Sequence, residues 1–183
     1  MINRTLVSIF LLTFFFTAFG QRFDLGIAAV YGDDITKFGQ NTRFYVNTND
    51  HRFCLGPEFS WFLEDSKMVG GEELVRNLVE FNFNGHMNVP LLGPLMFYPL
   101  VGLNYSVEKE KYLHNGEVAE AETLREWGLN VGSGLHLNLT KHWLVFVEYD
   151  HLFSELNQNT LTFGLLVGFG KIKGGHEVHE DGH

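Results

Sequence analysis

The chain has 183 residues, of which 22 are acidic and 13 basic, giving a formal net charge of −9 at pH 7. This length suits one domain, and the acidic balance argues against a nucleic-acid partner, which would require a basic face. The single cysteine, Cys54, excludes a disulfide within the chain.

The first twenty residues differ in character from the rest. Arg4 precedes an almost continuous apolar run over residues 6–16, and Ala18-Phe19-Gly20 supplies small residues at the spacing that a signal peptidase requires. A membrane-anchoring helix is the alternative, but it needs about twenty apolar residues and this run is shorter. We therefore expect a secretory signal peptide that is cleaved before Gln21.

The expected signal peptide divides the chain into three parts. Residues 1–20 form the signal, residues 21–171 form one domain, and residues 172–183 form a polar, His-rich C-terminal tail. No cysteine stands near the expected cleavage point, so a lipid anchor is not expected.

Apolar residues in the domain alternate with polar or small ones, and a period of two indicates β-strands. In segment 79–89, Phe81 and Phe83 share one parity while Glu80 and Asn82 share the other. The same division recurs in the segments that begin at Phe23, Arg52, Trp127, Trp143 and Leu161. Several segments run for about ten residues, which is the length that a tilted strand needs to cross a bilayer.

The breaks between these segments alternate between short and long. The short breaks are 48–50, 90–94 and 140–141, and the long polar breaks are 32–38, 64–73, 108–126 and 153–158. Transmembrane barrels of the outer membrane have short periplasmic turns and longer external loops. The sequence therefore predicts an all-β fold: a closed, antiparallel, up-and-down transmembrane β-barrel of about eight strands, with both chain ends on the periplasmic side.

Aromatic residues mark both ends of the predicted strands. About eight residues separate the two levels in three strands, which corresponds to roughly 20 Å at a strand tilt near 40°. We expect these side chains to lie at the two membrane interfaces: Phe23, Phe53, Phe97, Trp143 and Phe169 at the periplasmic rim, and Tyr31, Trp61, Tyr105, Trp127 and Tyr149 at the external rim.

Two local features need a special explanation within a barrel. Pro57 and Pro99 fall inside predicted strands, where each removes a hydrogen-bond donor, so we expect β-bulges there. The helix-forming composition of residues 117–126 is compatible with a short helix, and an extended hairpin arm is the favoured alternative.

Segment 97–103, the short turn at 139–143 and the glycine-alternating final strand resemble the small outer-membrane β-barrel domain family, which comprises porin-family proteins of Gram-negative bacteria. The resemblance covers residues 21–171 and implies an outer-membrane location, with membrane lipids and the barrel assembly machinery as partners, and no common catalytic residue. Barrels of this family usually end in an aromatic residue that the assembly machinery recognises, whereas here a polar tail follows Phe169. We expect a monomer.

Charged residues and histidines of the inward parity are the main candidates for a functional site, because a buried carboxylate needs a partner or a proton. We expect Arg43 to pair with Glu58 on the neighbouring strand, with Glu148 as a further partner, in a structural network that fills the lumen. The alternative is a gate in a narrow, cation-favouring pore or a proton-sensitive switch. The candidate network comprises Asp24, Arg43, Glu58, Glu80, His86, His136, Glu148 and Asp150.

Three other functions stay open at this point. A lipid-modifying enzyme could use Ser60, Ser106, Ser154 or His151 near the external rim, although none sits in a recognisable nucleophile motif. A binding or adhesion role could use the long loop 108–126, whose residues name no extracellular ligand. A secreted, lipocalin-like carrier would need the apolar parity to face inward.

The C-terminal tail offers the weakest candidate site. His176, His179 and His183 lie among carboxylates and could bind zinc, copper or nickel weakly. We expect no cofactor.

Overall fold

The computed structural model describes residues 22–34, 37–48, 52–114 and 117–170. The expected signal peptide, the cleavage point and the His-rich tail lie outside the described residues. Within them the chain forms ten strands: β1 (Arg22–Gly32), β2 (Lys37–Asn47), β3 (Phe53–Phe62), β4 (Asp65–Val69), β5 (Glu72–Met87), β6 (Val89–Leu92), β7 (Leu95–His114), β8 (Glu117–Asn138), β9 (Trp143–Phe153) and β10 (Asn159–Phe169).

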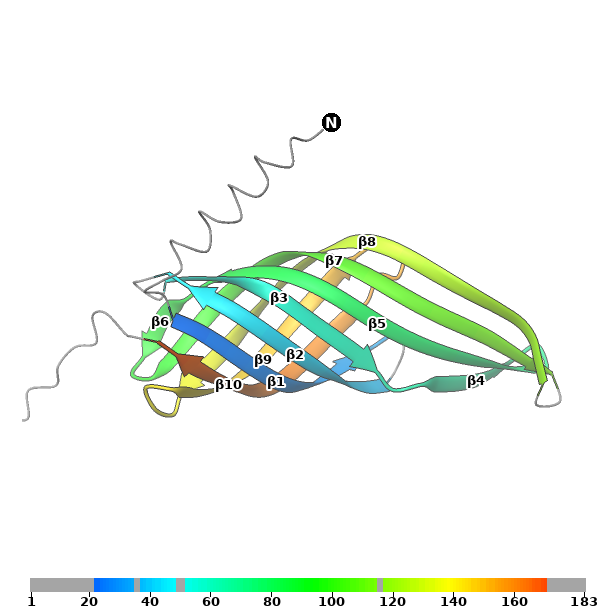
Figure 1. The fold of residues 1–183 in the computed structure, drawn as a ribbon, viewed down its shortest axis with the longest axis horizontal. Helices are drawn as coiled ribbons and strands as arrows, with labels where there is room; N and C mark the ends of the chain where they lie inside the picture. Colours follow the sequence, from blue (N-terminus) through cyan, green and yellow to red (C-terminus); the bar gives the residue numbers. More distant parts are fainter. Residues whose placement is uncertain (1–21, 35–36, 49–51, 115–116, 171–183) are drawn as a thin grey trace, which may run out of the picture.

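Eight of these strands close into a barrel (Figure 1). Around the barrel the order is β1, β2, β3, β5, β7, β8, β9 and β10, and every neighbouring pair is antiparallel. β1 and β10 complete the ring over a register that runs from Phe23 opposite Phe169 to Gly32 opposite Thr160. The predicted eight-stranded antiparallel barrel is confirmed. In the described part of the chain, no helix is long and apolar enough to cross a membrane.

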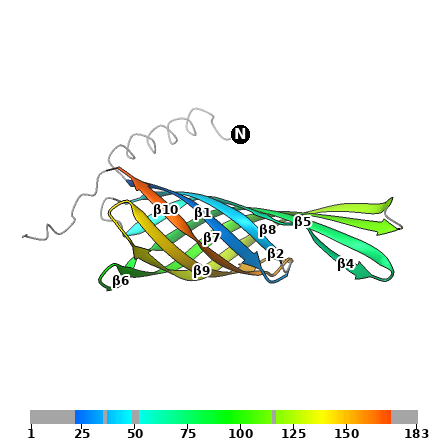
Figure 2. The same cartoon turned by 90° about the horizontal axis from the view of Figure 1, so that it is seen from below.

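The two remaining strands lie at opposite ends. β6 is a short partner of β7 at the end where β1 begins, whereas β4 pairs with the far half of β5 (Figures 1 and 2). At that far end β5, β7 and β8 continue well past the barrel, so that β4-β5-β7-β8 forms a projecting sheet. We call this sheet the extension.

The extension corrects two expectations. Segments 64–73 and 108–126, predicted as loops, consist largely of paired strand. The extended hairpin arm favoured for 117–126 is confirmed and the helix alternative is wrong, because these residues continue β8 in pairing with β7. In segment 64–73, strand pairing persists because a tight turn closes β4 onto β5. Gly70 and Gly71 in this turn have φ angles of 63° and 94°, which suit glycine in a two-residue hairpin.

The apolar parity faces outward. Phe81 and Val131 are 51% and 47% exposed, whereas Glu80, Asn130 and Glu148 on the opposite parity are buried. Because a lipocalin-like carrier requires the reverse arrangement, the structure excludes that alternative.

The bulges expected at the two prolines are absent. Pro57 stands opposite Phe83, and Pro99 stands opposite Ser133, with no register shift at either position. On the other side of β3, the pairing with β2 is interrupted between Arg43 and Val46 and resumes in the same register. The N–H group that Pro57 lacks is thus accommodated by a local interruption of the β2–β3 pairing, without an inserted residue.

The interior is not wholly polar. One apolar cluster inside the barrel consists of Ala28, Tyr45, Leu144, Phe146 and Leu166. A second cluster, nearer the extension, consists of Val30, Phe62 and Leu78. β9 therefore directs Leu144 and Phe146 inward, which explains the weak alternation of that strand in the sequence.

Candidate functional site in the barrel interior

The centre of the interior is an ion-pair network around Arg43. Its guanidinium donates two hydrogen bonds of 3.1 Å to the two carboxylate oxygens of Glu148, across the barrel on β9. It also lies 3.0 Å from Glu58 on the adjacent strand β3. All three side chains are at most 2% exposed, so one buried cation faces two buried carboxylates.

Neutral donors complete this network. Tyr45, Asn41 and Asn84 donate hydrogen bonds to Glu58, and Tyr98 donates one of 2.9 Å to Glu148. Sequence reasoning did not select these four residues, although each has the inward parity of its strand. The signal that could have found them is the gathering of Asn and Tyr on a face that is otherwise lined with carboxylates, because buried carboxylates need donors.

The network also has an apolar contact. The Arg43 guanidinium carbon lies 4.3 Å from the centre of the Phe146 ring, within the range of a cation–π interaction. Contacts with residues of β3 and β9 therefore hold the buried Arg43 side chain in the lumen.

Between the Arg43 network and the extension, buried side chains close the lumen a second time. Phe62 and Leu78 are fully buried, and Leu156 from the β9–β10 loop packs against them. Gln158 from the same loop donates a 3.1 Å hydrogen bond to Glu80, and Thr160 donates one of 2.7 Å to Asp150. Glu80 and Asp150 thus have their own partners outside the hydrogen bonds and ion pairs of the Arg43 network.

At the base of the extension, a third charged group forms around Arg76. Its guanidinium lies 2.6 Å from Asp34 and 2.5 Å from Glu108, with Glu110 at 3.4 Å. Burial acts to lower the pKa of Arg76, but the hydrogen bonds and charges of Glu108 and Asp34 raise it above its ordinary value. Burial and the neighbouring Glu108 raise the pKa of Glu110. Arg76 was missed because it precedes the segment predicted as strand.

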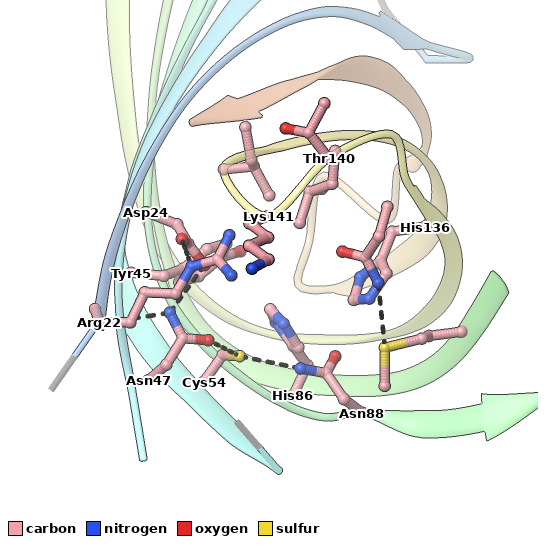
Figure 3. Close-up of a pocket in the computed structure, with 14 residues that line it drawn as sticks. Arg22, Asp24, Tyr45, Asn47, Cys54, His86, Asn88, His136, Thr140 and Lys141 are labelled. Atoms are coloured by element: carbon pink, nitrogen blue, oxygen red, sulfur yellow. Dashed lines mark hydrogen bonds and ion pairs between the residues drawn. The ribbon is translucent and has the colours of Figure 1, made fainter. Parts of the chain in front are cut away.

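The opposite end of the lumen holds an open pocket of about 360 Å³ (Figure 3). Asp24 lines it and accepts hydrogen bonds of 2.7 Å from Arg22 and from Asn47. His86 and His136 also line it, and their rings flank Tyr98 at centroid distances of 4.6 and 5.6 Å. The structure therefore places three predicted network residues in this pocket, outside the hydrogen bonds and ion pairs of Arg43.

The pocket has few strong polar contacts beyond Asp24. The Cys54 thiol donates to Asn47 and accepts from Asn88. His86 Nδ1 is buried without a hydrogen-bond partner among the described residues. In the part of the chain that the structure describes, no group of three or more His, Cys, Asp or Glu side chains is arranged to hold a metal ion.

The candidate catalytic residues do not form a catalytic group. Ser60 accepts a hydrogen bond from Asn41, Ser106 donates to Asn104, and Ser154 accepts from the Leu156 backbone. His151 contacts Asn159, and none of the three serines is hydrogen-bonded to a histidine within the described ranges. The predicted metal ligands His176, His179 and His183 lie outside those ranges.

The ten aromatic residues expected at the membrane rims all lie on barrel strands and have the outward parity. Trp61, Trp127 and Tyr149 are exposed. Tyr105 and Trp127 stand opposite each other, with their ring centres 4.9 Å apart, where the extension leaves the barrel. At the other end Phe23 stands opposite Phe169.

Comparison with known proteins identifies the fold. No family model matches the chain, and no curated protein sequence matches it. Among solved structures, Ail, the attachment invasion locus protein of Yersinia pestis, is 14% identical, with a TM-score of 0.58 over 82% of this chain and 99% of its own. A major outer membrane protein from Thermus thermophilus is 11% identical, with a TM-score of 0.61 over 81% and 99%.

A third similar structure is the N-terminal β-barrel domain of OprF from Pseudomonas aeruginosa, which is 15% identical, with a TM-score of 0.55 over 82% of this chain and 99% of that domain. At these identities the similarity concerns the fold alone. The chain therefore has the eight-stranded barrel fold found in bacterial outer-membrane proteins.

Proposed function

We propose that the protein is a monomeric, integral outer-membrane barrel with a closed lumen, which anchors the extension outside the cell. The observation that carries the proposal is the outward apolar surface of a closed barrel: residues such as Ile27, Phe81 and Leu103 are about half exposed or more. Monomeric soluble proteins rarely expose a continuous apolar band of this kind, whereas lipid-facing barrel surfaces require one.

The same proposal includes the route to the membrane. The signal peptide is cleaved before Gln21, and the barrel assembly machinery inserts the mature chain with residues 172–183 on the periplasmic side. The aromatic residues at both ends of the strands then lie at the two membrane interfaces, where amphipathic rings are favoured.

Membrane fractionation tests the location. We expect the protein to be extracted from membranes only by detergent, and its gel mobility to differ between unheated and boiled samples. Recovery in the soluble fraction, with one mobility under both conditions, would overturn the proposal.

Conductance tests the closed lumen. A porin-like pore was one expectation for this chain, but Arg43 and Phe62 are buried in the lumen at two levels, and the ion pairs of Arg76 lie beyond them at the base of the extension. We expect no stepwise current from the full chain in planar bilayers. Reproducible cation-selective steps would favour the narrow pore over the structural anchor.

A binding or adhesion role is the second candidate, favoured by the free edge of the extension. Pairing of β8 with β9 begins at Leu129, so residues 117–126 pair with β7 but with no second strand among the described residues. A strand of a partner can add to such an edge. Deleting the tip, residues 112–120, should then reduce cell adhesion while the heat-modifiable gel shift persists, and unchanged adhesion would reject this role.

A further inference from the structure

The two faces of the extension differ in charge. Side chains with the inward parity are mainly acidic: Asp65, Glu72, Glu108, Glu110, Glu120, Glu122 and Glu126, against Lys67 and Arg76. The outward parity, which continues the lipid-facing surface of the barrel, carries Lys109, Lys111 and Arg125 against Glu73 and, just before β4, Glu64. The surplus of positive charge thus lies on the face that points toward the surrounding membrane.

The three outward cations are available for a partner. Lys109, Lys111 and Arg125 are exposed, and none of them forms a salt bridge with another described residue. On the opposite face, by contrast, Arg76 is enclosed by carboxylates. The outward cations therefore need no displacement of an internal partner to bind an anion.

A hollow of about 200 Å³ lies between two of the outward cations, Lys109 and Lys111, and β5. Lys109, Lys111, Asn77, Val75 and Glu64 line it. The two ammonium groups and the Asn77 amide are hydrogen-bond donors, and the single carboxylate leaves the lining with a net positive charge. Such a lining suits a phosphate group with a short polar headgroup.

Arg125 lies at the height of the headgroup layer, whereas Lys109 and Lys111 lie about 5 and 10 Å further out and reach toward it with their long side chains. Arg125 lies two residues beyond Trp127, and Lys109 lies four residues beyond Tyr105, on the strands that leave the barrel. At about 3.3 Å per residue and a tilt near 40°, these positions are about 5 and 10 Å above the aromatic level. Polar headgroups occupy the first several ångströms outside the hydrocarbon core, and long basic side chains reach them easily.

We propose that Lys109, Lys111 and Arg125 form a binding site for the phosphate groups of anionic lipids in the outer leaflet. The site rests on the membrane insertion proposed above and adds a defined lipid contact to it. It orients the extension on the membrane surface, because the cationic face is drawn to the leaflet while the acidic face is repelled by it.

Tryptophan quenching by brominated lipids tests the site directly. Trp127 is 73% exposed, and Arg125 is the neighbouring outward-facing residue on β8. The fluorescence of Trp127 therefore reports the lipid bound at this position. The full chain carrying Trp61→Phe and Trp143→Phe is inserted into phosphatidylcholine vesicles that contain phosphatidylglycerol. Bromine is placed on one lipid or the other, and the two degrees of quenching give the relative affinity.

We expect phosphatidylglycerol to be preferred about fivefold near Trp127, the contribution of one cation to one anionic lipid. Lys109→Gln, Lys111→Gln and Arg125→Gln together should bring the ratio close to one. Lys67→Gln removes an exposed lysine from the opposite face and should leave the preference intact. A preference that survives the triple substitution, or is lost with Lys67→Gln, would overturn the site.

Two further arms separate the possible causes. Ten millimolar sodium phosphate should leave the preference unchanged, whereas its loss at an ionic strength held constant would identify a free-phosphate site. The heat-modifiable gel shift is recorded in the same vesicles. A missing shift in both lipid mixtures means that the membrane proposal fails, whereas a normal shift with equal quenching by both lipids means that only the lipid site fails.

Discussion

Replacing Arg43 by methionine removes the cation that pairs with both Glu58 and Glu148. The two carboxylates stay on opposite walls of the lumen, and both are 2% exposed, so water does not take over the role of the guanidinium. Removal of one partner from a buried ion pair costs about 3–5 kcal/mol. Since one cation serves two carboxylates here, we expect Arg43→Met to lower the free energy of unfolding by at least that amount.

A set of variants separates charge from geometry. Arg43→Lys keeps the charge but cannot make the paired hydrogen bonds to Glu148, so it should fall between the wild type and Arg43→Met. Arg43→Met combined with Glu148→Met removes one of the stranded carboxylates and should recover part of the loss. Arg125→Met, at an exposed position, is the control and should change stability by less than about 0.5 kcal/mol.

Urea titration of the barrel in neutral vesicles measures these changes, with tryptophan emission following unfolding and gel mobility following the folded fraction. The reasoning fails if Arg43→Met unfolds within about 1 kcal/mol of the wild type, which is what a solvated, weakly coupled pair would give. It also fails if the double variant is less stable than Arg43→Met.

Three other changes test separate parts of the structure. Tyr98→Phe removes a buried donor to Glu148 and should cost about 1–3 kcal/mol in the same urea titration, with loss of less than about 0.5 kcal/mol counting against the hydrogen bond. Cys54 is 4% exposed, so maleimide labelling of the folded barrel should be at least tenfold slower than in urea, and equal rates would place the thiol in solvent. Asn159 donates to Asp33 and lowers the pKa of that carboxyl, so the Asp33 contribution to stability is present above its unfolded pKa and is lost as pH falls through the folded value. Asn159→Ala should therefore move the Asp33 titration observed by NMR upward, and an unchanged titration would assign the shift to another group.

The sequence was sufficient to predict which way side chains face, since alternation in a strand directly separates the two surfaces. Phe81 and Glu80, one residue apart, lie outside and inside the barrel as expected. The sequence could not predict which inward residues meet. Arg43 and Glu148 are 105 positions apart and touch only because the closed ring places β2 and β9 across the lumen from each other.

The ends of the strands were harder to predict than their faces. Segment 108–126 contains many charged residues, and such a composition suggests a loop. Its two halves instead continue β7 and β8, whose pairing here runs from Val107 opposite Arg125 to Tyr112 opposite Glu120. Strand pairing there rests on hydrogen bonds and cross-strand contacts outside the region where apolar alternation is required. The apolar alternation that contact with lipid requires does not predict strands that continue beyond the membrane.

The composition of the central network has a consequence for transport. Glu58 and Glu148 exceed the charge of Arg43 by one, yet Tyr45, Asn41, Asn84 and Tyr98 supply neutral donors to the same oxygens. Glu58 thus has four contacts and Glu148 three without a mobile counter-ion, and a passing cation would have to break several of these buried contacts to bind them. This arrangement favours a rigid core over a selectivity filter, and it assigns interaction with other molecules to the surfaces outside the lumen.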